Sequence, residues 1–254
     1  MPSTNRFGSK PGLETKASTP PVVFRLRRPR SVSPADGGGA DFFNIAQYIA
    51  LPGRRLLHHS GMASIVQSIN VGQAREVQIG GRGVMTAIAK RPLPGPVAVG
   101  RMGLAGDEQA DLSVHGGLGK AVYAYPAEHY PFWQTVRAQA RVSLWDETLP
   151  PGSMGENLTL AGLLENQVWV GDVLRFANCE LAVNEPRFPC FKFNAVMGFS
   201  QASQLMEANA WCGFYLAVRV TGTLSPGEAF ELVPGPREVG IVELFRARVA
   251  GRRR

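Results

Sequence analysis

The sequence predicts a mainly β fold, a closed or nearly closed β-barrel with a few short helices, preceded by a disordered N-terminal leader. Short runs rich in Val, Ile, Thr and aromatic residues recur from Ala63 onward between glycine or proline breaks, as in all-β domains built from many short strands. From Ala63 onward, two short segments have the pattern of helices. Residues 1–60 are rich in Pro, Ser, Gly and Arg, so they bury too little apolar surface to offset the entropy of ordering.

Eight segments have the residue pattern of strands. In order they are SIVQSINV, GVMTAIA, PVAVGRM, KAVYAY, QVWVGDVLRF, CELAVNE, GFYLAVRVTG and AFELVP. In the sixth, Cys179, Leu181 and Val183 alternate with polar or charged residues, as the inward face of a strand does. We therefore expect Cys179 to be a buried core residue.

Two segments have the pattern of helices. Residues 126–139 begin with Pro126, where a first-turn proline is tolerated, and Pro131 is expected to shorten or offset this helix. Residues 200–210 follow Gly198 and start with a serine. Both helices are short, so they are expected to cover a β core rather than form one.

The chain is expected to divide into a leader at 1–60, a β-barrel domain at 61–235 and a short basic tail at 236–254. An arginine-rich leader is also typical of a transit peptide. Alternatively, the leader is not translated, because Met62 immediately precedes the first strand.

The positive charge is concentrated at the two ends of the chain. The net charge is +7, yet residues 1–60 carry nine Lys or Arg against three Asp or Glu, and residues 61–254 carry 18 against 17. This distribution does not support nucleic-acid binding by the folded part. The three cysteines, without CxxC pairs or a secretory signal, indicate a reducing compartment. No apolar run is long enough to cross a membrane, so we expect a soluble, cytoplasmic protein.

Cys190 lies in an unusual setting, the segment EPRFPCFKF. Pro186 and Pro189 restrict the backbone before it, and Arg187 and Lys192 place positive charge on both sides, which favours a thiolate. Such a thiolate can serve as a nucleophile, a metal ligand or half of a redox disulfide; the alternative is a buried core cysteine. The role of Cys212 stays open.

Two further polar stretches interrupt the strand pattern. GLAGDEQADLSVHGGLGKAVYAY contributes Asp107, Gln109, Asp111, His115, Gly116, Gly117 and Lys120, and MGENLT contributes Glu156, Asn157 and Thr159. The glycines after His115 let backbone amides approach an anion. Zinc-ligand spacing, a GxSxG elbow and Rossmann or P-loop glycine patterns are all missing. A nucleophilic pair of Cys190 and His115 remains an open alternative.

Four motifs together resemble a known family. They are TAIAKRPLPGPVAV, GLAGDEQADLSVHGGLGKAVYAYPAEHYPFW, MGENLTLAGLLENQVWVGDVLRF and EPRFPCFKF. Their order and spacing resemble the MOSC domain, the module named for the C-terminal part of molybdenum cofactor sulfurases. The resemblance covers about Ala63 to Val233 and is strongest to stand-alone bacterial proteins of the 6-N-hydroxylaminopurine-resistance type.

The resemblance implies a MOSC-type β-barrel that binds molybdenum cofactor (molybdopterin), with Cys190 as the protein ligand to molybdenum. It implies cofactor binding by Lys90, Gln109, Gly116, Gly117, Lys120, Glu156, Asn157, Thr159, Arg187 and Lys192. Pyridoxal phosphate is not expected. Trp211 and Cys212 stand where relatives commonly have an arginine followed by serine or threonine, so one anion contact is expected to be missing. Met154 replaces a usual phenylalanine, and the tail is too short for the three-helix domain of larger relatives.

The implied activity is a detoxifying oxidoreductase that reduces N-hydroxylated bases or related N-oxygenated compounds. Electrons would come from an external flavin or iron–sulfur reductase, because the sequence has no site for either centre. Cys190, Asp107, Asp111 and His115 are the candidate catalytic residues, the last three as proton donors. The alternatives are a cofactor carrier or sulfur-transfer module without substrate turnover, and a metal-free barrel with a reactive cysteine.

Overall fold

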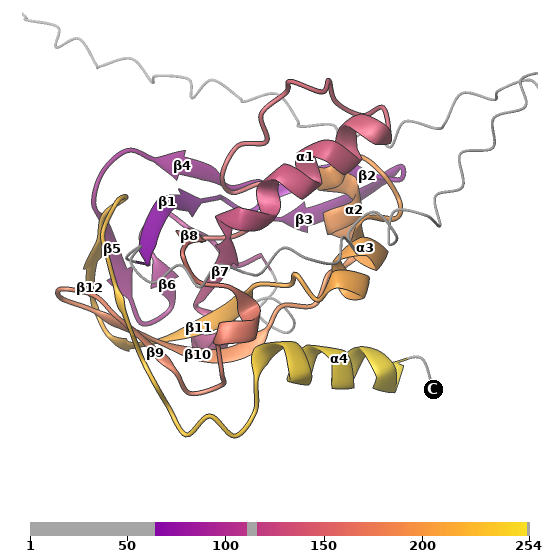
Figure 1. The fold of residues 1–254 in the computed structure, drawn as a ribbon. Helices are drawn as coiled ribbons and strands as arrows, with labels where there is room; N and C mark the ends of the chain where they lie inside the picture. The colour runs from indigo at the N-terminus through magenta and orange to yellow at the C-terminus, as the bar shows by residue number, and fades with distance from the viewer. Residues whose placement is uncertain (1–63, 111–115, 253–254) are drawn as a thin grey trace, which may run out of the picture.

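The computed structural model describes residues 64–110 and 116–252, and the leader expected at 1–60 lies outside them. The strands are β1 (Ile65–Val71), β2 (Arg75–Ile79), β3 (Arg82–Thr86), β4 (Arg91–Leu93), β5 (Val97–Gly100), β6 (Gly103–Leu104), β7 (Val122–Pro126), β8 (Leu158–Ala161), β9 (Val173–Arg175), β10 (Glu180–Pro186), β11 (Phe214–Val220), β12 (Gly222–Leu224) and β13 (Glu231–Val233). The α-helices of this part are α1 (Tyr130–Gln139), α2 (Phe191–Met197), α3 (Ala202–Asn209) and α4 (Ile241–Arg252). The mainly β prediction is confirmed (Figure 1).

The strands form one large sheet and two small ones. The large sheet has eight strands in the order β13-β9-β10-β11-β7-β8-β1-β4; β12-β5-β6 and the β2-β3 hairpin are separate. Neighbours in the large sheet are antiparallel except for β7 and β8, which are parallel. β-Bulges interrupt the pairing of β10 with β11, one of them between Val183 and Glu185. A bulge re-aims the residues that follow it, and here those residues are the Cys190 segment.

The sequence predicts a closed or nearly closed barrel. Among the described strands no closed barrel is found, because β13 and β4 remain edges of the large sheet. The start of β1, the strand next to the β4 edge, nevertheless approaches the segment before β13. The backbone amide of Val66 donates to the carbonyl of Glu228 at 2.9 Å, and that of Phe230 donates to Ser64 at 3.0 Å. Hydrogen bonds therefore join the start of β1 to the segment that leads into β13, without a full strand pair.

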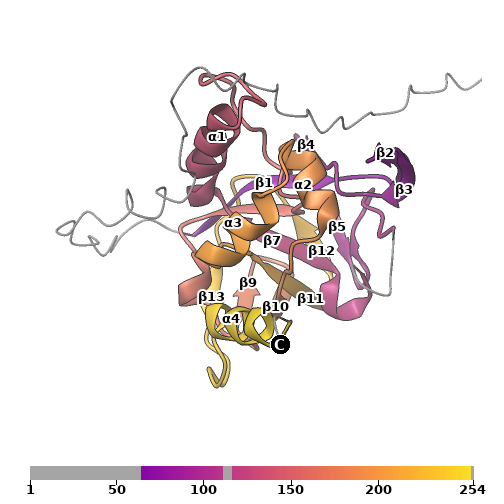
Figure 2. The same cartoon turned by 90° about the vertical axis from the view of Figure 1, so that its right-hand side faces the viewer.

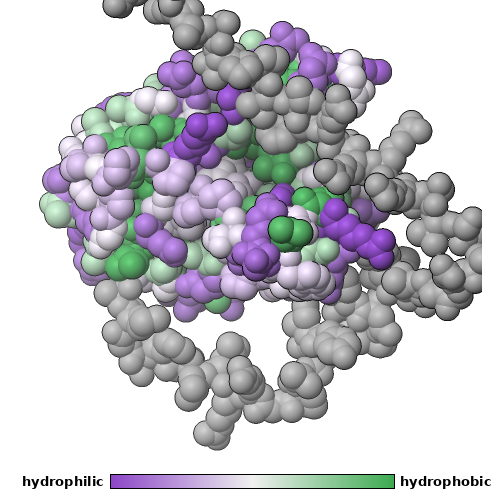
Figure 3. Space-filling view, turned by 90° about the horizontal axis from the view of Figure 1, so that it is seen from above, coloured by the Kyte–Doolittle hydropathy of each residue, from purple (hydrophilic) through white to green (hydrophobic). Residues whose placement is uncertain are grey.

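The helices cover opposite sides of the sheet. In Figures 1 and 2, α1 lies at the top of the molecule, α2 and α3 lie together, and α4 lies beneath next to β10. Under α1 to α3, an aromatic core contains Trp133, whose indole donates to the Tyr125 hydroxyl at 2.7 Å. The main core lies inside the large sheet and includes Cys179, which is buried as expected. Where the face in Figure 3 is not grey, hydrophobic and hydrophilic residues are interspersed.

In the part of the chain that the structure describes, both predicted helices are present and two further α-helices were not predicted. Pro131 lies at the start of α1, where its missing amide costs nothing, and a 3-10 turn at Ala127–His129 precedes it. α3 occupies most of the segment predicted at 200–210. α2 begins directly after Cys190, and α4 occupies most of the predicted tail at 236–254.

Candidate functional site

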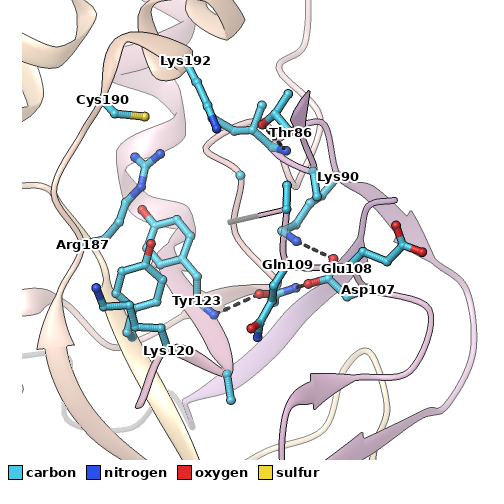
Figure 4. A pocket seen from close by; sticks show the side chains of 17 residues that line it. Thr86, Lys90, Asp107, Glu108, Gln109, Lys120, Tyr123, Arg187, Cys190 and Lys192 are labelled. Carbon is cyan, nitrogen blue, oxygen red and sulfur yellow. Dashed lines mark hydrogen bonds and ion pairs between the residues drawn. The ribbon is translucent and has the colours of Figure 1, made fainter. Parts of the chain in front are cut away.

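A single pocket gathers side chains from segments that are far apart in the sequence (Figure 4). It is bordered by the end of β3 and the segment after it, by residues 107–110, by the start of β7, by the β10–α2 turn and by β11. The predicted site residues that line it are Lys90, Asp107, Gln109, Lys120, Asn157, Arg187, Cys190 and Lys192. The structure thus brings together residues from all of the polar stretches identified in the sequence.

Cys190 is the one cysteine of the three that borders this pocket. It is partly exposed, whereas Cys179 and Cys212 are buried. Its backbone is extended and lies at the start of α2, with its carbonyl accepting from the amide of Phe193 at 2.9 Å. Burial raises the pKa of the Cys179 thiol to about 11 and raises that of Cys212 well above its usual range. The two buried thiols therefore stay protonated, and Cys190 is the cysteine available for chemistry.

Arg187 brings a buried positive charge to the same wall of the pocket as Cys190. It is only 4% exposed, and its guanidinium lies over the rings of Tyr123 and Phe193 at 5.1 and 5.2 Å. No carboxylate among the described residues lies within ion-pair distance of it. Although burial opposes the charged form, attraction to Tyr123 and Tyr215 raises the pKa of Arg187. A buried cation of this kind favours an anionic ligand.

Two lysines add positive charge around this wall. Lys192 donates from Nζ to the backbone oxygen of Met85 at 3.2 Å. Lys120 pairs with Glu185 at 3.4 Å, and its ammonium lies 5.7 Å from the centre of the Tyr215 ring. Both side chains also line the pocket, so the Cys190 side is strongly cationic.

The opposite wall carries a fixed ion pair. Lys90 and Asp107 form a short salt bridge, and both side chains are largely buried. The Asp107 carboxylate also accepts from the amide of Gly72 at 2.7 Å and from Asn157 Nδ2 at 2.8 Å. Burial lowers the pKa of Lys90, and the attraction of Asp107 opposes this effect. The pair therefore places a proton-bearing group and its counter-charge at the pocket wall.

The two amide side chains of the site are held by hydrogen bonds within the protein. Asn157 Oδ1 accepts from the amide of Tyr123 at 3.0 Å, and its Nδ2 donates to Asp107 and to the carbonyl of Asn70. Gln109 accepts from the amide of Gly117 at 2.8 Å and donates to the carbonyl of Met102 at 2.8 Å. These amides fix the shape of the wall around Asp107.

Some predicted site residues lie away from the pocket or outside the described residues. Glu156 is fully buried and accepts hydrogen bonds from Tyr130, Thr159 and the amides of Gly152 and Met154. Burial raises the pKa of Glu156 despite these donors. Glu156 and Thr159 thus tie the MGENLT turn to α1 and are not among the residues that line the pocket, and neither are Gly116 and Gly117. Asp111 and His115 lie outside the described residues.

Tyr123 and Tyr215 line the pocket and were not predicted from the sequence. Their ring centres are 5.4 Å apart, and the Tyr123 hydroxyl donates to the carbonyl of Cys212 at 2.9 Å. Burial raises the pKa of both tyrosines. An aromatic residue in a strand is typical of a core position, so only the proximity of β7 to β11 could have indicated this role.

This mainly β fold, with a basic cysteine segment facing a charged pocket, is the fold of the MOSC domain, and the chain belongs to the MOSC domain family. The family model matches residues 111–231. The chain is 38% identical over 184 residues to the uncharacterized protein YflK of Bacillus subtilis (strain 168), covering 72% of this chain and 79% of YflK. It is 34% identical over 168 residues to the protein YiiM of Escherichia coli (strain K12), covering 66% and 73% respectively.

A solved structure and a larger relative extend these similarities. The crystal structure of YiiM from Geobacillus stearothermophilus matches with a TM-score of 0.59 and 29% identity, over 75% of this chain and 86% of that one. A protein named reductase in Gibberella moniliformis (strain M3125 / FGSC 7600) is 31% identical over 68% of this chain but only 30% of its own length. Among the described residues, no helix has both the length and the apolar character needed to span a membrane.

Proposed function

We propose that the pocket binds molybdenum cofactor through Cys190 and that the protein reduces N-hydroxylated bases or related N-oxygenated compounds. The observation that carries the proposal is the placement of the Cys190 thiol and the buried Arg187 cation on one wall of one pocket. Membership of the MOSC family, the similarity to YiiM and the similarity to a protein named reductase support it.

The residues of the pocket fit this cofactor in the chemistry of their donor groups. A thiolate suits a soft metal environment, and Cys190 is the partly exposed thiol. The cofactor carries a phosphate, and Arg187, Lys120 and Lys192 supply cations for it. Among the described residues, no group of three or more His, Cys, Asp or Glu side chains could hold a simple metal ion. This finding agrees with a site in which the protein contributes one sulfur and the cofactor contributes the rest.

The proposed reduction breaks the N–O bond of a hydroxylamine, consumes two electrons and two protons, and releases an amine and water. When bound, molybdenum cofactor supplies the two-electron oxygen chemistry. The protein must supply protons, and the Lys90–Asp107 pair is a proton-bearing group at the pocket wall. Tyr123 and Tyr215 present aromatic surface suited to a planar base. An external flavin or iron–sulfur reductase is the proposed electron donor.

Metal analysis and a chemical electron donor test this proposal. The protein is produced in a host that synthesises the cofactor, and molybdenum per chain is measured after purification. With reduced viologen as donor, the loaded protein should convert 6-N-hydroxylaminopurine to its amine. A protein that is fully loaded and accepts electrons, yet reduces no member of a panel of hydroxylamines, is not such a reductase. If the same protein passes its cofactor to an apo-enzyme, it is a carrier.

A further inference from the structure

Helix α4 lies beyond the segment that matches the MOSC model, which ends at residue 231. It packs beneath β10 (Figures 1 and 2). Ile241 and Phe245 are fully buried and belong to the main hydrophobic core. The helix is therefore an integral part of the fold, and its position beneath β10 brings it next to the strand that leads to Cys190.

The apolar face of α4 contacts the Cys190 segment directly. Phe245 stacks on Phe188, with ring centres 5.1 Å apart and planes inclined by 16°. The guanidinium of Arg252 lies 4.6 Å from the centre of the same Phe188 ring. Phe188 follows Arg187 immediately and precedes Cys190 by two positions. The helix thus packs on the residue between the two groups that define the cationic wall.

A shared carboxylate links α4 to a third group of that wall. Glu185 Oε1 lies 3.4 Å from Lys120 Nζ, and Glu185 Oε2 accepts from Arg248 Nη1 at 2.7 Å. The Glu185 side chain is 19% exposed, so water screens these charges only in part. Because Arg248 holds one oxygen of Glu185, the carboxylate is shared between two cations, and its hold on the Lys120 ammonium, which lines the pocket, is weaker.

We propose that Arg248 of α4 is a positioning residue of the pocket: by sharing Glu185 with Lys120, it raises the positive potential at Cys190. The proposal concerns the same pocket as the proposed function, but its test needs no cofactor and no turnover. An experiment can therefore contradict the proposed role of Arg248 without contradicting the proposed function, and the reverse.

The test compares the alkylation rates of Cys190 with two reagents in cofactor-free protein. Iodoacetate is an anion and iodoacetamide is neutral, so the rate with iodoacetate divided by the rate with iodoacetamide reports the potential at the thiol. A more positive potential gives a higher ratio. Cys179 and Cys212 are 1% and 0% exposed and do not compete in the folded protein. Arg248→Gln should lower the ratio about twofold to fivefold, the range expected for a partly screened ion pair. Glu185→Gln should raise it.

The control is Arg246→Gln, which removes the same charge from an exposed position of the same helix. It should change the ratio much less. In the Glu185→Gln background, Arg248→Gln should have little further effect, because the carboxylate through which it acts is gone. The proposal is overturned if Arg248→Gln and Arg246→Gln have equal effects, or if Arg248→Gln lowers the ratio by the same factor with and without Glu185.

Discussion

The imidazole of His129 lies flat against the indole of Trp211, with ring centres 4.5 Å apart and planes inclined by 13°. His129 Nε2 lies 2.8 Å from a Glu165 carboxylate oxygen, and the other oxygen accepts from the amide of Gly213 at 2.9 Å. Both side chains of the pair are buried. Trp211 thus covers a buried polar pair that ties the start of α1 to the start of β11.

His129→Ala is expected to destabilise the fold, because it leaves the Glu165 carboxylate buried without its partner. We expect a loss of about 2 to 4 kcal/mol in the free energy of unfolding, measured by urea denaturation. Molybdenum content per folded chain should not change, since neither residue lines the pocket. A loss below about 0.5 kcal/mol, the size typical of surface substitutions, would show that the pair is not a structural tie.

Cys190→Ser should abolish molybdenum binding and leave the thermal stability of the cofactor-free protein almost unchanged, because Cys190 is partly exposed. Cys179→Ser should lower the stability and leave molybdenum binding by the folded protein unchanged. It places a hydroxyl in the main core and should cost about 1 to 3 kcal/mol. Metal content and thermal melts are measured on both proteins. Normal metal content in the Cys190 variant would exclude this thiol as the metal ligand.

Arg187→Met tests whether Arg187 is needed for cofactor binding rather than for the stability of the protein. The side chain packs on Tyr123, Phe193 and Met206, and methionine offers a similar apolar volume without a charge to desolvate. We expect the cofactor-free variant to be as stable as the wild type or up to about 1 kcal/mol more stable. Its cofactor content should fall sharply. A stable variant that retains its cofactor would argue against Arg187 as an anion ligand.

Asp107→Asn is expected to lower the pKa of Lys90 further below its ordinary value of 10.5. Burial already lowers this pKa, and Asp107 opposes that effect, so removal of the carboxylate leaves burial dominant. The native state then binds fewer protons than the unfolded state, and stability rises with pH from the folded pKa of Lys90 up to 10.5. NMR titration of 13C-methylated lysines measures the pKa. Glu108→Gln, which neutralises a neighbouring carboxylate, is the control and should leave the titration of Lys90 unchanged.

The sequence predicts those strands and helices that can be recognised from the pattern of their own residues. Each of the eight predicted segments contains or overlaps an observed strand, and Cys179 is buried as its alternation with Leu181 indicated. The short β4 and β8 were not predicted because they depend on pairing with β1, which is distant in the sequence, and β6 has only two residues. α2 was not predicted because the prolines before it interrupt any periodic pattern. α4 was not predicted because its arginines make the apolar spacing of Ile241 and Phe245 hard to recognise.

The candidate site was predictable where charge or an unusual backbone marks a residue. Lys90, Asp107, Arg187 and Cys190 all line one pocket. Glu156 has the same polar character, yet it points into the protein because four donors converge on it. Residue type alone does not distinguish a carboxylate that faces a ligand from one that holds a turn together.

The hydrogen bonds between residues 64–66 and 227–230 join the first described residues to the segment before β13. During synthesis, β1 can pair with β4 and β8 once residue 161 has left the ribosome, but its contacts with the segment before β13 must wait for residues 227–230. Pairings of such large sequence separation form slowly. An incomplete nascent chain therefore leaves one edge of the first residues of β1 unpaired, a template for association with other chains. Any chaperone that protects this protein should be needed most just before Glu228 emerges.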